Sequence, residues 1–174
     1  MQKQTNTFAT GAWVVHQSYG VGQIQGIETR TISGEETPYY HLIIKATNSH
    51  IWIPTDKLAD DARSLTSPEE FQKALAILER PPHPMADHLN QRSKRIADVR
   101  AQNSPIELAR LLRDLWARQK ERGALSQTET DAMRRITNRF VGEWAICMGM
   151  TLEEAEEKLL EHLQRGREKA TSDN

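Results

Sequence analysis

The chain has 174 residues and a formal net charge of -1, so it can hold one domain or two small ones, and its overall charge gives no sign of nucleic acid binding. It has one cysteine, no apolar run of membrane-spanning length, and a polar head, Met1 to Thr7, without the apolar core of a secretory signal. These features favour a soluble protein of the reducing cytoplasm. Any contact with nucleic acid would have to depend on a local concentration of charge.

The first third of the chain is patterned as short strands joined by tight turns. The turns contain glycine, serine and asparagine, and Pro54 ends the last strand because proline cannot donate to a strand ladder. The apolar stretches expected to form strands are 8–15, 21–30, 39–45 and 51–53. Four or five short strands within about fifty residues predict a small SH3-like or Tudor-like antiparallel β-barrel.

After Leu65 the pattern changes to helices, because each apolar stretch follows a capping sequence. Four capping residues stand three positions before a glutamate, and the first two are followed by proline, which suits the first helical position. These residues are Ser67, Ser104, Ser126 and Thr151. Gly123 and Gly149 are placed to end two of the helices, and each start is followed by apolar residues at three-to-four spacing.

A weaker helical segment, 84–102, lies behind a cluster of prolines and is largely basic or amide-bearing. With it, four to five helices are expected, and the polar stretch from Arg165 to Asn174 is expected to fray. Residues 57–66 are expected to be a short connector. The sequence therefore predicts an α+β protein, with a β-barrel domain at 1–60 and an all-α domain at 61–174.

No motif in the chain indicates catalysis or a bound metal. Of the six histidines, His83 and His88 lie close together, but no second pair of ligands stands at zinc spacing. The serines cluster at caps and turns, and Gly20 and Gly22 precede a strand, so they do not form a phosphate cradle at a helix start. We therefore expect no enzyme activity, no cofactor and no metal.

Trp52 lies between Ile51 and Ile53 and must point to the opposite side of its strand. If the isoleucines fill the barrel, the indole is on the surface, where Arg30 and Ile32 nearby would make it a protein-interaction site. If the indole is in the core, the isoleucines are not, and the sequence leaves both arrangements open. The other tryptophans lie on apolar runs and are expected in the core: Trp13, Trp116 and Trp144.

Basic residues are concentrated between Pro81 and Gly123, whereas the last helix is acidic. A basic, weakly amphipathic helix can contact DNA phosphates, which adds affinity without reading sequence. Basic residues at helical spacing are also common on ordinary solvated faces, so charge alone does not decide between the two.

The order of these parts resembles the bacterial CarD/CdnL family. In the β half, Tyr19-Gly20-Val21-Gly22, Gly26-Ile27-Glu28-Thr29-Arg30 and Ile51-Trp52-Ile53-Pro54 are similar to that family's RNA-polymerase-interacting domain. In the helical half, the similarity lies in the run from Leu111 to Trp116 and in Glu121-Arg122-Gly123. It covers nearly the whole chain from Phe8 to Leu163. Transcription-repair coupling factors share only the barrel with this chain, and 174 residues are too few to hold their large helicase part as well.

The resemblance implies a global transcription regulator. Such a protein binds the β subunit of RNA polymerase through the barrel and promoter DNA through the helical domain, and it stabilises the open promoter complex. By position, the resemblance places polymerase contacts at Arg30, Ile32 and Trp52, where Trp52 stands in place of an arginine of some members. No membrane partner is implied, and we expect a monomer in solution.

The chain differs most from the family at the DNA-binding helix. The family's tryptophan wedge, which inserts at the upstream edge of the transcription bubble, falls at Leu89, and leucine lacks the stacking area and N–H donor of indole. The basic residues after that wedge have counterparts at Arg92, Lys94 and Arg95, so phosphate contact is expected there. The alternative is a polymerase-bound adaptor whose helical domain contacts another protein and does not insert into DNA.

Overall fold

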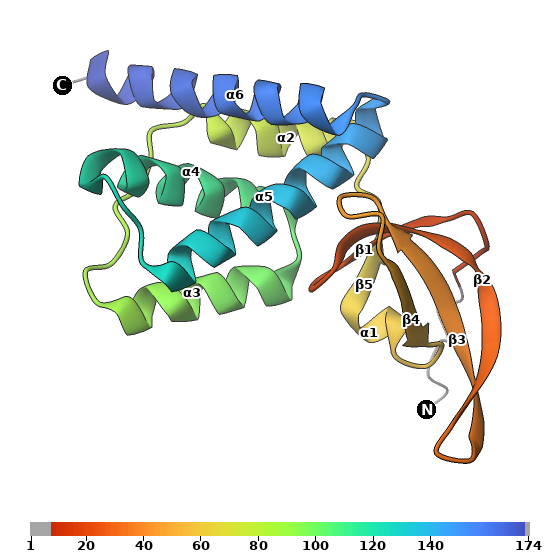
Figure 1. Ribbon diagram of the computed structural model, residues 1–174. Helices are drawn as coiled ribbons and strands as arrows, with labels where there is room; N and C mark the ends of the chain where they lie inside the picture. Colours follow the sequence, from red (N-terminus) through yellow and green to blue (C-terminus); the bar gives the residue numbers. More distant parts are fainter. Residues whose placement is uncertain (1–7, 173–174) are drawn as a thin grey trace, which may run out of the picture. The chain divides into compact units, whose positions relative to one another are not determined.

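The computed structural model describes residues 8–172, in which the chain divides after Leu65 into a β unit and a helical unit (Figure 1). The β unit holds a five-stranded antiparallel sheet with the strand order β4-β3-β2-β1-β5. Its elements are β1 (Trp13–His16), β2 (Gly20–Ile32), β3 (Glu35–Ile44), β4 (His50–Pro54), the one-turn helix α1 (Leu58–Asp61) and β5 (Ala62–Ser64). The expected α+β class, with a β domain followed by helices, is confirmed.

The sheet takes in part of the expected connector. Within residues 57–66 the structure has α1 and β5; β5 pairs with β1, and the Leu58 side chain is completely buried. The expectation of a plain connector is wrong because a strand of three residues is too short for an alternating pattern to stand out. The first strand is also shorter than expected, since it begins at Trp13.

The longest feature of the sheet is the hairpin of β2 and β3, which projects beyond the other strands (Figure 1). Its turn has two residues, Ser33 and Gly34, both with positive φ (56° and 86°), as a type I′ turn requires. One irregularity in the pairing, between Ile24 and Gly26, bends β2 near its middle. Beyond that point the strands pair without interruption up to Ile32 and Glu35.

The core of the β unit settles the direction of Trp52. The core consists of Val14, Ile24, Tyr40, Leu42, Ile53 and Leu58, and Ile51 packs against it. Because Ile51 and Ile53 both point inward, Trp52 lies on the outer face of the sheet. Trp13, expected in the core, is only half-buried.

The helical unit contains α2 (Pro68–Leu78), α3 (Leu89–Gln102), α4 (Pro105–Arg122), α5 (Gln127–Met148) and α6 (Leu152–Ser172). Ser67 caps α2, Ser126 forms a full capping box on α5, and Thr151 and Glu154 exchange the same two bonds at the start of α6. Ser104 differs, because its side chain makes no capping bond. Gly123 and Gly149 end α4 and α5 in the left-handed conformation, as expected.

The core of the helical unit is centred on the aromatic contacts of Phe71 with Phe140 and Trp144, and Trp116 is buried in it. The last helix continues to Ser172, so the expected fraying from Arg165 is wrong for residues 165–172. Its second half is held to the end of α2, where Glu79 accepts bonds from Arg165 and Lys169. Among the described residues, no helix is both long enough and apolar enough to cross a lipid bilayer.

Candidate functional site

The outer face of the β sheet carries a stacked cluster around Trp52. The guanidinium carbon of Arg30 lies 3.8 Å from the centre of the indole, which is cation–π distance. The imidazole of His41 stacks on the same indole with ring centres 4.6 Å apart and an angle of 8°. Trp52 and His41 are direct cross-strand partners on β4 and β3, while Arg30 reaches over from β2. Three strands therefore contribute to one exposed surface.

Glu28 fixes the arrangement of this cluster. Its carboxylate accepts a hydrogen bond from the indole N–H of Trp52 at 2.8 Å and lies 3.2 Å from Nδ1 of His41 and 3.7 Å from the Arg30 guanidinium. His50 extends the cluster, because its Nδ1 lies 2.8 Å from Nε2 of His41 and one of the two nitrogens must carry the proton. We call Glu28, Arg30, His41, His50 and Trp52 the sheet-face cluster.

Ile32 lies on the same face as this cluster, toward the tip of the hairpin. Glu28, Arg30 and Ile32 are spaced two residues apart in an unbroken stretch of β2, so they share one face. The Ile32 side chain is 54% exposed. Ile27 is equally exposed, at 55%, but it lies an odd number of residues away and therefore faces the opposite side of the hairpin.

The sequence named Arg30, Ile32 and Trp52, and the structure places all three on one face. The sequence did not identify Glu28, His41 or His50 as site residues. Cross-strand partners can be found only once the strand register is known, and the bulge after Ile24 shifts that register by one residue. A cluster assembled across three strands therefore has no local sequence pattern.

In the helical unit, Arg92 points inward. Its side chain is 8% exposed, its Nε donates to Glu129 at 2.6 Å, and its Nη1 donates to the carbonyl oxygens of Ala86 and Asp87 at 2.9 and 2.6 Å. The guanidinium thus ties the start of α3 to α5 and fixes the turn that precedes α3. In this arrangement it has no surface to offer to a phosphate.

Glu129 is the buried centre of this network. It also accepts a bond from Arg118 at 3.1 Å and bonds from the backbone N–H and hydroxyl of Ser126 at 3.0 and 2.7 Å. Burial raises the pKa of Glu129, but the hydrogen bonds from Ser126 and Arg92 outweigh it and hold the pKa below its usual value of 4.5. The carboxylate is therefore charged at neutral pH.

Arg95 docks α3 against α4. It donates to Oδ2 of the fully buried Asp114 at 2.6 Å, and Asp114 also accepts from Arg113 at 2.8 Å and from the backbone of His83 at 2.9 Å. The Arg95 side chain keeps 36% of its surface exposed. Lys94 is exposed on the outer side of α3, and Leu89, its first residue, is 46% exposed.

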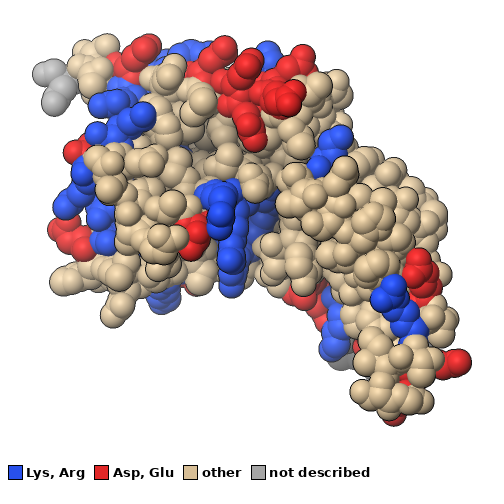
Figure 2. Space-filling model, viewed as in Figure 1, with Lys and Arg blue, Asp and Glu red and all other residues tan. Residues whose placement is uncertain are grey.

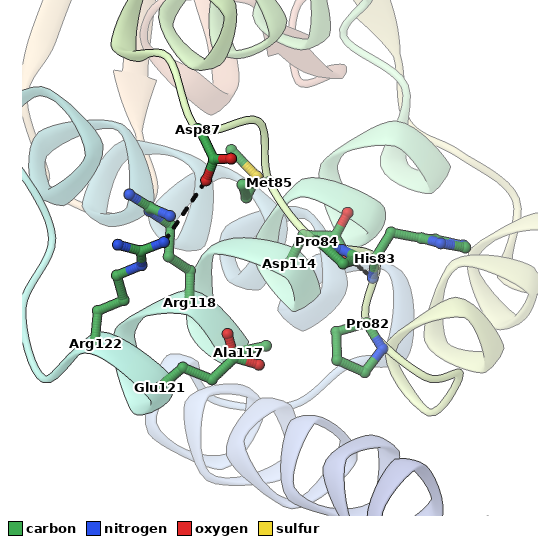
Figure 3. A pocket seen from close by; sticks show the side chains of 10 residues that line it. All are labelled: Pro82, His83, Pro84, Met85, Asp87, Asp114, Ala117, Arg118, Glu121 and Arg122. Atoms are coloured by element: carbon green, nitrogen blue, oxygen red, sulfur yellow. Dashed lines mark hydrogen bonds and ion pairs between the residues drawn. The ribbon is translucent and has the colours of Figure 1, made fainter. Parts of the chain in front are cut away.

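A small pocket of about 150 Å³ opens beside the end of α4, lined mainly by the 82–87 segment and α4 (Figure 3). Asp87 points toward Arg122, at 3.7 Å, and Asp114 and Arg118 belong to the ion networks described above. Pockets that bury small ligands are typically about 300–1,000 Å³. Asp87 pairs with Arg122, and Asp114 and Arg118 pair with side chains outside the pocket, so we assign this pocket no catalytic role.

Charge is unevenly distributed over the helical unit. In Figure 2, acidic side chains gather over α6, whereas basic ones gather where α5 passes α3. The acidic residues of α6 are Glu153, Glu154, Glu156, Glu157 and Glu161, all exposed. The exposed cations on α3 and α5 include Lys94, Arg100, Arg134 and Arg135.

Comparison with known proteins gives a match to each unit. Residues 8–65 match the family described as the CarD-like/TRCF RID domain, and residues 73–160 match the family described as the CarD C-terminal domain. A protein of Bacillus subtilis (strain 168), named "Putative transcription factor YdeB", is 27% identical over 148 residues, covering 83% of this chain and 94% of that protein.

Proposed function

The chain belongs to the CarD family, and from this premise we propose that it is a transcription regulator that acts on RNA polymerase. Its β unit belongs to the group of polymerase-interacting domains. We propose further that the β unit binds the β subunit of the polymerase, that the helical unit contacts promoter DNA, and that the two contacts together stabilise the open promoter complex.

The observation that carries the proposal is the sheet-face cluster. Tryptophan and arginine are the residues most often found to dominate binding energy at protein interfaces. Here they stack on each other, and Glu28 holds the indole by its N–H, so both side chains are ordered before a partner arrives. Less conformational freedom is then lost on binding. Ile32 adds exposed apolar area on the same face.

The experiment is binding of the full chain to RNA polymerase and to its isolated β subunit. Arg30→Glu removes the stacked cation and places a second carboxylate beside Glu28, so we expect at least about a 30-fold loss of affinity, equal to about 2 kcal/mol. Lys57→Glu, the same charge reversal at an exposed site outside the cluster, is the control. If both variants bind like the original chain, the assignment of this face to polymerase fails.

A second pair of variants tests the face without changing charge. Ile32→Ala and Ile27→Ala remove the same side chain from positions with nearly equal exposure on opposite faces of the hairpin. We expect only Ile32→Ala to weaken polymerase binding. Equal losses would mean that the partner encloses the whole hairpin rather than one face.

The residues expected to contact DNA differ in how exposed their side chains are. Leu89 and Lys94 are exposed, Arg95 is partly exposed, and Arg92 would have to leave Glu129 to reach a phosphate. The internal pairing of Arg92 and Arg95 favours a second candidate, a polymerase-bound adaptor that contacts another protein. A DNA footprint of the polymerase–promoter complex with and without the chain separates the two, since only the DNA-contacting regulator extends or strengthens protection of the duplex.

A further inference from the structure

The basic surface where α5 passes α3 contains two arginines that the structure leaves exposed. Arg100 on α3 and Arg135 on α5 are both exposed, and neither forms an ion pair within the described part of the chain. Arg110 and Arg134, in contrast, are exposed arginines whose guanidinium groups already bind Glu107 and Asp131. Of these four arginines, only Arg100 and Arg135 present an uncompensated charge.

Bonds at both ends of α3 fix the alignment of α3 with α5. Arg92, near the start of α3, bonds to Glu129 near the start of α5. At the other end Arg139 donates to Oδ1 of Asn103 at 2.8 Å and to the carbonyl of Arg100 at 3.4 Å. The two helices therefore run side by side in the same direction, and Arg135, one turn before Arg139, lies beside the second half of α3.

The helical period places Arg100 and Arg135 on the same open side of this pair. On α3, Arg95 points to Asp114 of α4, and Arg100 lies about 140° around the helix from it, on the side away from α4. On α5, Arg135 lies about 40° from Arg139, which faces α3, and further from the buried Phe140 side. Figure 2 shows basic side chains gathered over the junction of α3 and α5.

Leu89 extends the same surface to the other end of α3. It lies on the same flank as Arg100, about 20° apart around the helix and about 16 Å along its axis. The flank between them carries Ser93 and Ile96, which are both half-buried, and Ile96 packs against the core of the helical unit. We call Leu89, Ser93, Arg100 and Arg135 the seam surface.

We propose that double-stranded promoter DNA lies along the seam surface, with Arg100 and Arg135 contacting phosphates and Arg92 and Arg95 serving to hold α3 in place. This inference rests on the proposed function and names the side chains that carry its DNA contact. A separation of about 16 Å corresponds to about five base-pair steps of 3.4 Å, so Leu89 and Arg100 would contact points half a turn of duplex apart.

The test is the salt dependence of duplex binding by the full chain, measured by fluorescence anisotropy. Each phosphate contact contributes about 0.9 to the slope of log K against log salt concentration. The double variant Arg100→Gln/Arg135→Gln should therefore lower the slope by about 2 and weaken binding at low salt. The control is Arg110→Gln/Arg134→Gln, which removes the same net charge from arginines that are already paired, and it should keep the original slope.

A third variant tests the role given to Arg95. Arg95→Gln should lower the melting temperature of the helical unit while leaving the salt slope unchanged; a fall of about 1 in the slope would make Arg95 a phosphate contact instead.

The outcomes separate this inference from the function on which it rests. If the original chain binds no duplex at low salt, DNA contact itself is refuted and the adaptor function stands. If the original chain binds but the seam variant and its control behave alike, the DNA contact stands and the seam surface is refuted.

Discussion

Replacing Glu129 by alanine should cost the helical unit a large part of its stability. The Glu129 side chain is 2% exposed and accepts bonds from Arg92, Arg118 and both donors of Ser126. Removing it leaves the Arg92 and Arg118 guanidinium groups, 8% and 14% exposed, without their counter-charge. Loss of one partner from a buried ion pair typically costs about 3–5 kcal/mol, because the remaining charge stays desolvated.

The assay is thermal unfolding followed by circular dichroism at the helical signal. For a domain of this size each kcal/mol lowers the melting temperature by about 4–8 °C, so a loss of about 4 kcal/mol corresponds to roughly 15–30 °C. Glu129→Gln keeps one acceptor oxygen and should fall between Glu129→Ala and the original chain. The control, Glu161→Ala, removes an exposed ion pair with Arg165 and should cost at most about 1 kcal/mol.

A double-mutant cycle checks that the loss comes from the ion pair. Arg92→Met/Glu129→Met removes both charges, so its destabilisation should be clearly smaller than the summed losses of the single variants Arg92→Met and Glu129→Met. If the single losses simply add, or if Glu129→Ala costs less than about 1 kcal/mol, buried ion pairing of Glu129 does not stabilise α3.

Three further predictions concern the helical unit. Gly166→Ala should destabilise it by about 1–3 kcal/mol, because a Cβ at this site would lie 2.4 Å from the carbonyl oxygen of Leu78; stabilisation, the usual result of Gly→Ala in a helix, would contradict the close packing of α6 on α2. A hydrogen bond from Lys169 lowers the pKa of Glu79 below 4.5, so the ionised Glu79 stabilises the fold above that pH, and this stabilisation is lost as the pH falls through the folded-state pKa. Glu79→Gln should therefore make the stability less sensitive to acid. An unchanged pH profile of unfolding would exclude a stabilising role for the Glu79 carboxylate. Leu89→Ala should shorten the lifetime of the open promoter complex if leucine still wedges between bases, and an unaltered lifetime would mean that this protein works without a wedge.

Much of the secondary structure could be predicted because it is encoded locally. The capping box of Ser126 and Glu129 and the left-handed glycines at 123 and 149 need only neighbours within a few residues. The expected fraying after Arg165 was wrong for the opposite reason. Arg165 and Lys169 bind Glu79, which lies more than eighty residues earlier in the chain, so nothing near them in the sequence shows that they are held.

The candidate sites also combine features set by neighbouring residues with features set by distant ones. Alternation around Trp52 limited its direction to two possibilities, and only the burial of Ile53 decided between them. For Arg92 the sequence favoured the surface, because basic residues on a weakly amphipathic helix are usually solvated. Its inward direction depends on Glu129, whose position as the third residue of a capping box gave no sign of a second role.

The proposed DNA contact does not need a tryptophan at position 89, because the proposed contact with polymerase keeps the chain close to DNA. Non-specific duplex binding at physiological salt typically has a Kd of about 10⁻⁴–10⁻⁶ M. A chain held on the polymerase experiences nearby DNA at an effective concentration on the order of 1 mM, which exceeds those values at least about tenfold. Phosphate contacts through Arg100 and Arg135 would then be mostly occupied without a wedge. By the same arithmetic, Arg30→Glu should remove the promoter contact together with the polymerase contact, although Arg30 lies in the other unit.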